Sequence, residues 1–293
     1  MRKQKVEGQE RHPAAAGCRQ RLVAVMVLLT ALICGSARAQ SPAQAPPQPY
    51  SEGQGEQGLS TDPPPIPVEE IIRRFGAREQ EMKIEREKFT YQQTFVFQTI
   101  DNDGAVDGEY RMSSDIVFSS DGKRYEKITD APQPTLQRVS VSQQDLDDLE
   151  HVQPFVLTTE ELPKYEIKYA GREQVDEIAT YVFDVAPKKI EKKQRYFQGR
   201  IWVDERDMEI VKTFGKAVPD IHTRDNENVF PRFETIRENI EGNYWFPTYT
   251  HADDTLHFLL QNVRVRMTVR YKNYKRYGVT VKFGTPTEVK PPN

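Results

Sequence analysis

Two histidines and two aspartates near the end of the chain form a group with metal-ligand chemistry: His251, Asp253, Asp254 and His257. Imidazole nitrogens and carboxylate oxygens bind zinc, and a zinc-bound water could make this segment part of a secreted hydrolase. The two histidines are six residues apart, whereas paired zinc ligands commonly lie about three to five residues apart. We therefore expect a solvated loop without a metal here, and keep a metal-dependent hydrolase as a remote alternative.

Other catalytic signatures are missing from the sequence. It contains no G-x-S-x-G, no H-E-x-x-H and no phosphate-binding loop in a suitable context. The match to G-x-G-x-x-G at residues 53–58 lies in proline-rich sequence and lacks the flanking strand and helix that this motif requires. Asp204 or Asp207 could be paired with another acid, but both fall in an expected turn. The sequence predicts no catalytic residue and no cofactor.

Basic residues are concentrated near the end of the chain, where residues 255–287 contain no acidic residue. Four of the basic residues alternate along an expected strand: Arg264, Arg266, Arg270 and Lys272. We predict that they form an anionic contact surface, that is, a basic surface that contacts an anionic partner. Such a surface would suit anionic lipid, lipopolysaccharide or an acidic partner. The alternative is a solvated face that balances the acidic stretch 145–177. An N-terminal secretory signal argues against nucleic acid as the partner.

Aromatic residues are numerous for so polar a chain, with 14 Phe, 13 Tyr and 2 Trp among 293 residues. Large aromatic side chains on one side of a curved sheet can line a cavity for an apolar ligand. The residues that we predict to line such a cavity are Phe95, Phe97, Phe118, Tyr181, Phe183, Trp202 and Trp245. At any single position, the alternative is an ordinary core residue.

The first 67 residues are expected to lie outside the folded domain. Residues 1–39 resemble a secretory signal, because arginines precede a 12-residue apolar run and Ala37-Arg38-Ala39 is a small-x-small cleavage site. Both cysteines, Cys18 and Cys34, lie within this signal. Cleavage after Ala39 is expected, with retention as a membrane anchor as the alternative, and the location would be periplasmic. Residues 40–67 contain eight prolines and predict a disordered linker.

Residues 68–293 are expected to form one domain built mainly of antiparallel strands. Apolar residues spaced three and four apart predict a helix over residues 68–87, and Ser142 begins a capping-box pattern for a short helix. Period-two alternation, interrupted by polar turns, predicts about nine to eleven strands. In the central hairpin, residues 196–214, Trp202 comes just before the turn.

Three segments give the domain a resemblance to the LolA-like outer-membrane lipoprotein-sorting superfamily. They are Gly199-Arg-Ile-Trp202-Val-Asp204, the return strand Glu209-Ile-Val-Lys212, and Asn243-Tyr-Trp245-Phe246-Pro247. The resemblance covers about residues 68–283. It implies an incomplete antiparallel β-barrel with an N-terminal helix and short helical lids, around a hydrophobic cavity for acyl chains. Periplasmic sensors of the RseB type share this fold. The proline-rich linker and a longer insertion over residues 135–163 depart from the carriers, and no residue here is assigned as their lid-locking arginine.

Two main functional hypotheses follow from the sequence. The first is a non-enzymatic, monomeric envelope protein that holds a lipid or the acyl chain of a lipoprotein, in lipoprotein sorting or sensing. The second is a structural or sensor module with a filled core, which docks an inner- or outer-membrane protein through a sheet edge or the basic segment. The secreted hydrolase is the remote third. No nucleic-acid partner is expected.

Overall fold

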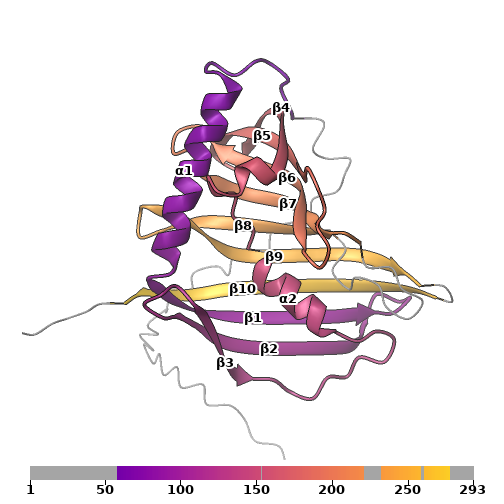
Figure 1. Ribbon diagram of the computed structural model, residues 1–293. Helices are drawn as coiled ribbons and strands as arrows, with labels where there is room; N and C mark the ends of the chain where they lie inside the picture. Colours follow the sequence, from indigo (N-terminus) through magenta and orange to yellow (C-terminus); the bar gives the residue numbers. More distant parts are fainter. Residues whose placement is uncertain (1–57, 153, 221–231, 259–260, 278–293) are drawn as a thin grey trace, which may run out of the picture. The chain divides into compact units, whose positions relative to one another are not determined.

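The computed structural model describes residues 58–152, 154–220, 232–258 and 261–277. Ten strands of this part form one antiparallel sheet in the order β3-β2-β1-β10-β9-β8-β7-β6-β5-β4 (Figure 1). The strands are β1 (Phe89–Ile100), β2 (Val106–Phe118), β3 (Arg124–Asp130), β4 (Tyr165–Val175), β5 (Ile178–Pro187), β6 (Tyr196–Asp204), β7 (Ile210–Val218), β8 (Phe233–Ile240), β9 (Tyr244–His257) and β10 (Asn262–Arg276). The predicted antiparallel, incompletely closed fold is confirmed, because β3 and β4 are the two unpaired edges of an open sheet.

The helical elements agree with the sequence patterns. Helix α1 (Val68–Arg86) is the predicted N-terminal helix, and α2 (Gln143–His151) begins with the predicted capping box. In that box, the Ser142 hydroxyl accepts from the Asp145 amide, and the Asp145 carboxylate accepts from the Ser142 amide. A short 3-10 helix, η1 (Leu162–Lys164), precedes β4. No helix in the described part of the chain is long and apolar enough to cross a membrane.

One expectation about the strands was wrong, and one strand was not predicted. The predicted solvated loop that carries His251 and His257 is instead the second half of β9, which pairs in register with β10. Pairing with the apolar residues of β10 fixes this polar stretch as a strand although its own residues favour a turn. Strand β3 was not predicted, because six of its seven residues are exposed and it therefore lacks an apolar alternation.

One face of the sheet, here called the inner face, carries a continuous apolar core. It includes Phe97 of β1, Val203 of β6 and Val265 of β10, which belong to one buried cluster with Ile71 and Phe75 of α1. Leu149 of α2 and the segment after it belong to the same cluster. Both helices thus cover the inner face (Figure 1). The other face, here called the outer face, carries the charged alternating residues of β10.

A pair of facing glycines lets β6 and β7 approach closely within this sheet. Gly199 lies directly opposite Gly215 in the register. A Cβ atom at residue 215 would lie 2.6 Å from the ring of the buried Phe197, and one at residue 199 would clash with the Phe214 carbonyl oxygen. Glycine inside a strand commonly marks such a close approach or a tight bend. The glycine of the hairpin motif is therefore required by packing.

The edge strand β4 is partly covered by residues that precede α1. Ser60 forms a bridge with Arg172, and the Tyr169 hydroxyl donates to the Asp62 carbonyl oxygen over 3.0 Å. These contacts involve the last part of the predicted linker 40–67. The predicted signal 1–39, the linker up to residue 57, and the end of the chain from residue 278 lie outside the described residues.

Candidate functional site

A helical lid, defined here as α2, residues 154–161 and η1, covers part of the inner face together with α1. Phe155 and Leu157 of the lid are buried in the same cluster as the inner-face residues of β5, β6 and β10. The Phe155 ring stacks on Phe197 of β6, with ring centroids 4.4 Å apart. The lid belongs to the insertion 135–163 that the sequence analysis singled out. Its apolar side chains therefore complete a core that the sheet and α1 leave open.

A buried ion pair joins α1, the lid and the sheet. Glu79 of α1 and Arg237 of β8 are almost fully buried, with side-chain exposures of 0% and 1%, and their nearest atoms are 2.7 Å apart. Arg237 also donates to the Phe155 carbonyl oxygen, and the Leu157 amide donates to Glu79 over 3.4 Å. We call this group the Glu79–Arg237 clasp. Because one bidentate arginine contacts both helix and lid, it fixes how both lie on the sheet.

A second buried acid holds the middle of α1. Glu209, in the turn between β6 and β7, is fully buried and forms an ion pair with Arg78. It also accepts from the Trp245 amide over 3.0 Å. Burial raises the pKa of Glu209, and the Trp245 amide and the Arg78 charge oppose that rise. These two polar contacts, together with an ion pair between Glu85 and Arg276 of β10 at 3.0 Å, attach α1 to the sheet besides the apolar contacts of Ile71 and Phe75.

A pocket of about 360 Å³ opens between α1, the lid and the starts of β4 and β6. We call it the seam pocket. Its lining includes Lys83 and Arg86 of α1, and it reaches the buried rings of Phe155 and Phe197. Ion pairs lie at its rim, where Arg195 contacts the buried Asp148 at 2.7 Å. Its lining is mainly polar and also contains the aromatic rings of Phe155 and Phe197, and the volume falls within the ligand-pocket range of roughly 300–1,000 Å³.

The residues predicted to line one cavity lie on both faces of the sheet. Those in the inner-face cluster or packed against it are Phe95, Phe97, Phe118, Tyr181 and Phe183. Trp202 is fully buried in a separate cluster with Val182 and Val211, and Trp245 packs against that cluster. Trp202 pairs with Val182, whereas its neighbour Ile201 pairs with Phe183. Because side chains alternate along a strand, the two tryptophans belong to the outer side, and a shared cavity with the five others is excluded by this geometry.

Trp202 is surrounded by charged groups on the outer face. Its indole N–H donates to Glu173 over 2.7 Å, and the Lys212 ammonium lies 4.8 Å from the ring centroid. Lys212 also forms an ion pair with Glu234, at 2.9 Å. Burial raises the pKa of Glu234, and the Lys212 charge opposes that rise. These contacts make Trp202 a structural residue beneath a polar network.

His251 lies next to this network, directly opposite Glu234 in the sheet register. Burial lowers the pKa of His251 to about 4, with a further contribution from the Lys212 charge, while Asp253 acts in the opposite direction. His257, at the exposed end of β9, contacts Asn262 at 3.0 Å. Within the described residues, no group of three or more His, Cys, Asp or Glu side chains is placed to hold a metal ion.

We expect His251→Gln to flatten the dependence of folding stability on pH. The folded protein binds fewer protons than the unfolded chain between the histidine's usual pKa of 6.5 and its folded value of about 4. Stability conferred by neutral His251 is therefore fully present above pH 6.5 and is lost as pH falls through 4. The loss is at most about 3 kcal/mol. Urea unfolding at several pH values measures it, with His257→Gln as control; parallel wild-type and His251→Gln curves would contradict the prediction.

The four predicted basic residues do share the outer face of β10, and two of them are neutralised by one carboxylate. Arg264 and Arg266 contact Asp253 of β9 at 3.1 and 3.2 Å. The Arg270 guanidinium lies 4.8 Å from the ring centroid of Tyr249, while Lys272 is exposed opposite Gln92. An anionic contact surface on this strand stays a prediction. Asp253, which was considered as a metal ligand, instead serves as the counter-ion of two arginines.

The two acids of the central turn also have structural partners. Asp204 is buried and accepts from the Arg206 amide over 2.8 Å, which closes the turn after β6. Asp207 forms an ion pair with Arg206 at 3.1 Å. The structure therefore gives both carboxylates local roles in the turn.

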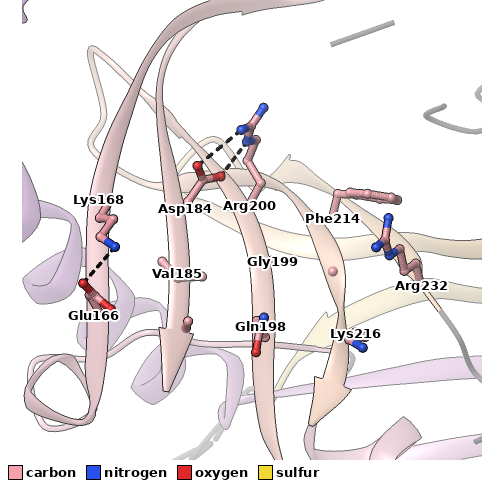
Figure 2. Close-up of a pocket in the computed structure, with 12 residues that line it drawn as sticks. Glu166, Lys168, Asp184, Val185, Gln198, Gly199, Arg200, Phe214, Lys216 and Arg232 are labelled. Atoms are coloured by element: carbon pink, nitrogen blue, oxygen red, sulfur yellow. Dashed lines mark hydrogen bonds and ion pairs between the residues drawn. The ribbon is translucent and has the colours of Figure 1, made fainter. Parts of the chain in front are cut away.

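A second pocket, of about 440 Å³, lies over β4 to β7 and was not predicted. Figure 2 shows Asp184 of β5 and Arg200 of the neighbouring strand β6 pointing toward each other, and Lys168 beside Glu166. The nearest nitrogen and oxygen atoms of these two ion pairs are 2.8 and 2.9 Å apart. The signal in the sequence was the recurrence of charged residues at alternate positions of consecutive strands. These charges neutralise one another within the pocket. We take the seam pocket as the candidate ligand site because the stacked rings of Phe155 and Phe197 line it.

Comparisons with known proteins find similarity in fold alone. The sequence matches no protein-family model and no curated protein. A DUF1329 family protein from Desulfovibrio piger has 17% identity over 74% of this chain and 95% of its own, with a TM-score of 0.38. LolA superfamily protein NE2245 from Nitrosomonas europaea has 14% identity over 72% and 98%, with a TM-score of 0.30. The Pseudomonas aeruginosa MucA/MucB complex contains a chain with 10% identity over 66% and 92%, with a TM-score of 0.20.

One of these solved structures belongs to the superfamily that the sequence motifs suggested. The similarity concerns the arrangement of strands and carries no function over to this chain.

Proposed function

We propose that this chain is a non-enzymatic binding protein that holds the hydrocarbon chain of a lipid or acylated protein between the inner face and the lid. The observation that supports this proposal is the seam pocket, which leads from the surface to the buried rings of Phe155 and Phe197. Each methylene that enters the apolar core would contribute about 0.8 kcal/mol. A chain of ordinary acyl length would therefore bind usefully in a partly open site.

The contacts that hold the lid in place are compatible with opening. The lid is attached to α1 and to β8 through the hydrogen bonds of the Glu79–Arg237 clasp, and also by the Asp148–Arg195 ion pair and the stacking of Phe155 on Phe197. Polar contacts of this kind can be exchanged for contacts with water when the lid moves. A lid that was paired to the sheet as a strand would instead have to break a ladder of backbone hydrogen bonds. A hydrocarbon chain could then replace lid side chains against the inner face, and the aromatic rings would remain covered.

The cell envelope is the proposed location of this function. The proposal rests on the signal-like residues 1–39, with their apolar run and small-x-small site. Exposure to the envelope would bring the protein next to acyl chains, and a carrier or sensor in lipoprotein traffic is the role that we propose.

A cysteine lock tests whether ligand uptake needs the lid to separate from α1. A Cβ atom at Gly76 would lie 2.6 Å from the Leu162 Cδ1 atom and 3.3 Å from its Cγ atom. A cysteine in place of Leu162 would therefore bring its sulfur next to a cysteine at residue 76, which is the arrangement that a disulfide needs. In a background with Cys18→Ser and Cys34→Ser, we expect oxidised Gly76→Cys/Leu162→Cys to take up a fluorescent fatty acid at least about tenfold more weakly than the reduced form. Leu162→Cys alone, which adds no atom beside Gly76, should not respond to oxidation, and equal uptake by both forms of the double variant would contradict lid opening.

Native mass spectrometry of protein purified without detergent measures the ligand directly. An added mass that dissociates as a lipid or acylated peptide would support the proposal. A clean apo mass, together with no uptake of the fluorescent fatty acid, would favour the docking alternative.

The observation that favours docking is the edge strand β3, on which Tyr125 and Ile128 are 48% and 57% exposed. An exposed edge with apolar side chains can pair with an extended segment of a partner.

A further inference from the structure

The buried side of α1 ends in an arginine. Ile71, Phe75, Glu79 and Met82 are fully buried at spacings of four, four and three residues, and Arg86 follows four residues later. Arg86 is half-buried, and its Nε atom is buried without a hydrogen-bond partner among the described residues. Glu79, on the same side of the helix, has Arg237 as its partner. Of these two charged residues on the buried side of α1, Glu79 therefore has an ion-pair partner, whereas the Arg86 Nε atom has no partner among the described residues.

The surroundings of Arg86 are aromatic and cationic. Burial raises the pKa of Tyr271, and the positive charges of Arg124 and Arg86 both oppose that rise, so both arginines act on the same hydroxyl. Arg124 of β3 is balanced by Glu126 and Glu150, at 3.1 and 3.3 Å. Within the described part of the chain, no ion pair involves Arg86. One positive charge at this place is thus left without a counter-ion.

Arg86 is also part of the lining of the seam pocket, together with Lys83 one turn earlier. The lining of that pocket also contains the apolar side chains of Val152, Phe155 and Phe197. A guanidinium group can bind a carboxylate or phosphate through two parallel N–H donors, and such bonds are stronger when they are shielded from water. The pocket lining therefore combines an arginine whose Nε atom has no partner among the described residues with apolar side chains.

We propose that the seam pocket recognises an anionic amphiphile, with Arg86 binding its carboxylate or phosphate head group and the hydrocarbon chain lying against Phe155 and Phe197. This inference rests on the proposed function and adds to it the charge of the ligand and the residue that selects it. Lys83, at the exposed rim, contributes a second positive charge. A neutral chain of the same length would make the apolar contacts alone.

Three ligands with the same twelve-carbon chain test the inference: dodecanoate, dodecyl phosphate and dodecanol, each measured by calorimetry below its aggregation concentration. We expect the wild type to bind at least one of the two anions about ten- to a hundredfold more tightly than dodecanol. Arg86→Gln should remove this preference and weaken dodecanol binding far less than anion binding, because dodecanol has no charge for Arg86 to pair with. Arg86→Lys should retain only part of it, because the charge remains and the fork is lost. The ratio of the two anions distinguishes a fatty acid from a phosphate-bearing lipid as the source.

Arg73→Gln is the matched control, since Arg73 lies on the same helix, is 69% exposed and pairs with Glu70. Arg86→Gln breaks no described hydrogen bond, and its thermal midpoint should stay close to that of the wild type. Equal binding of anions and dodecanol by the wild type, or a preference that survives Arg86→Gln, would overturn the inference and leave the proposed function standing. If none of the three ligands binds, the proposed function fails as well.

Discussion

Replacing Arg237 with Met is expected to lower the free energy of unfolding by about 3–5 kcal/mol, because the change leaves the Glu79 carboxylate buried without its partner. The Glu79 side chain is fully buried, and the Leu157 amide is its other described donor. The substitution also removes a donor from the Phe155 carbonyl oxygen, which faces the same interior. Urea unfolding, followed by the fluorescence of the two tryptophans, measures the loss.

A double substitution separates the cost of an orphaned charge from the value of the ion pair. Glu79→Leu/Arg237→Met removes both charges, and such replacements of buried pairs are commonly neutral or stabilising. We expect the double variant to recover most of the stability that Arg237→Met loses. Arg264→Met is the matched control, because Arg264 is 52% exposed beside Asp253 and should change stability by less than about 1 kcal/mol. If Arg237→Met and Arg264→Met lowered the free energy of unfolding by similar amounts, burial of the ion pair would not be the cause of the loss.

Truncating Trp202 to Ala is expected to cost about 3–5 kcal/mol of stability and to leave ligand binding intact. The indole is fully buried on the outer side, and its removal opens a cavity beside Val182 and Val211. It also leaves Glu173 without the indole donor. Trp202→Phe, which keeps most of the volume, should cost less. Unfolding curves and dodecanol binding at a temperature where the variant is folded measure the two quantities separately.

Phe155→Ala provides the contrast for that binding measurement. Phe155 lines the seam pocket and stacks on Phe197, so its truncation should weaken dodecanol binding as well as stability. If Trp202→Ala weakens binding as strongly as Phe155→Ala does, then the ligand contacts the outer side of the sheet. The assignment of the inner face as the binding face would then be wrong.

The local sequence was sufficient for most elements of the fold. The three-and-four spacing of apolar residues predicted α1, the capping box predicted α2, and period-two alternation predicted the hairpin of β6 and β7. These signals are local because a helix or strand that packs on one side must repeat its apolar residues with its own period. Strand β3 and the second half of β9 lack that repeat. They are strands because neighbouring strands pair with them, which no local pattern records.

The sequence by itself determined that Trp202 and Phe197 lie on opposite sides of one strand, because they differ by an odd number of residues. It did not determine which of those sides faces α1. The tertiary structure decided this, and it also brought Glu79 to Arg237, although 158 residues separate them in the chain. A buried ion pair and a pocket between helix, lid and sheet arise from contacts among distant segments, and neighbouring residues carry no trace of such contacts.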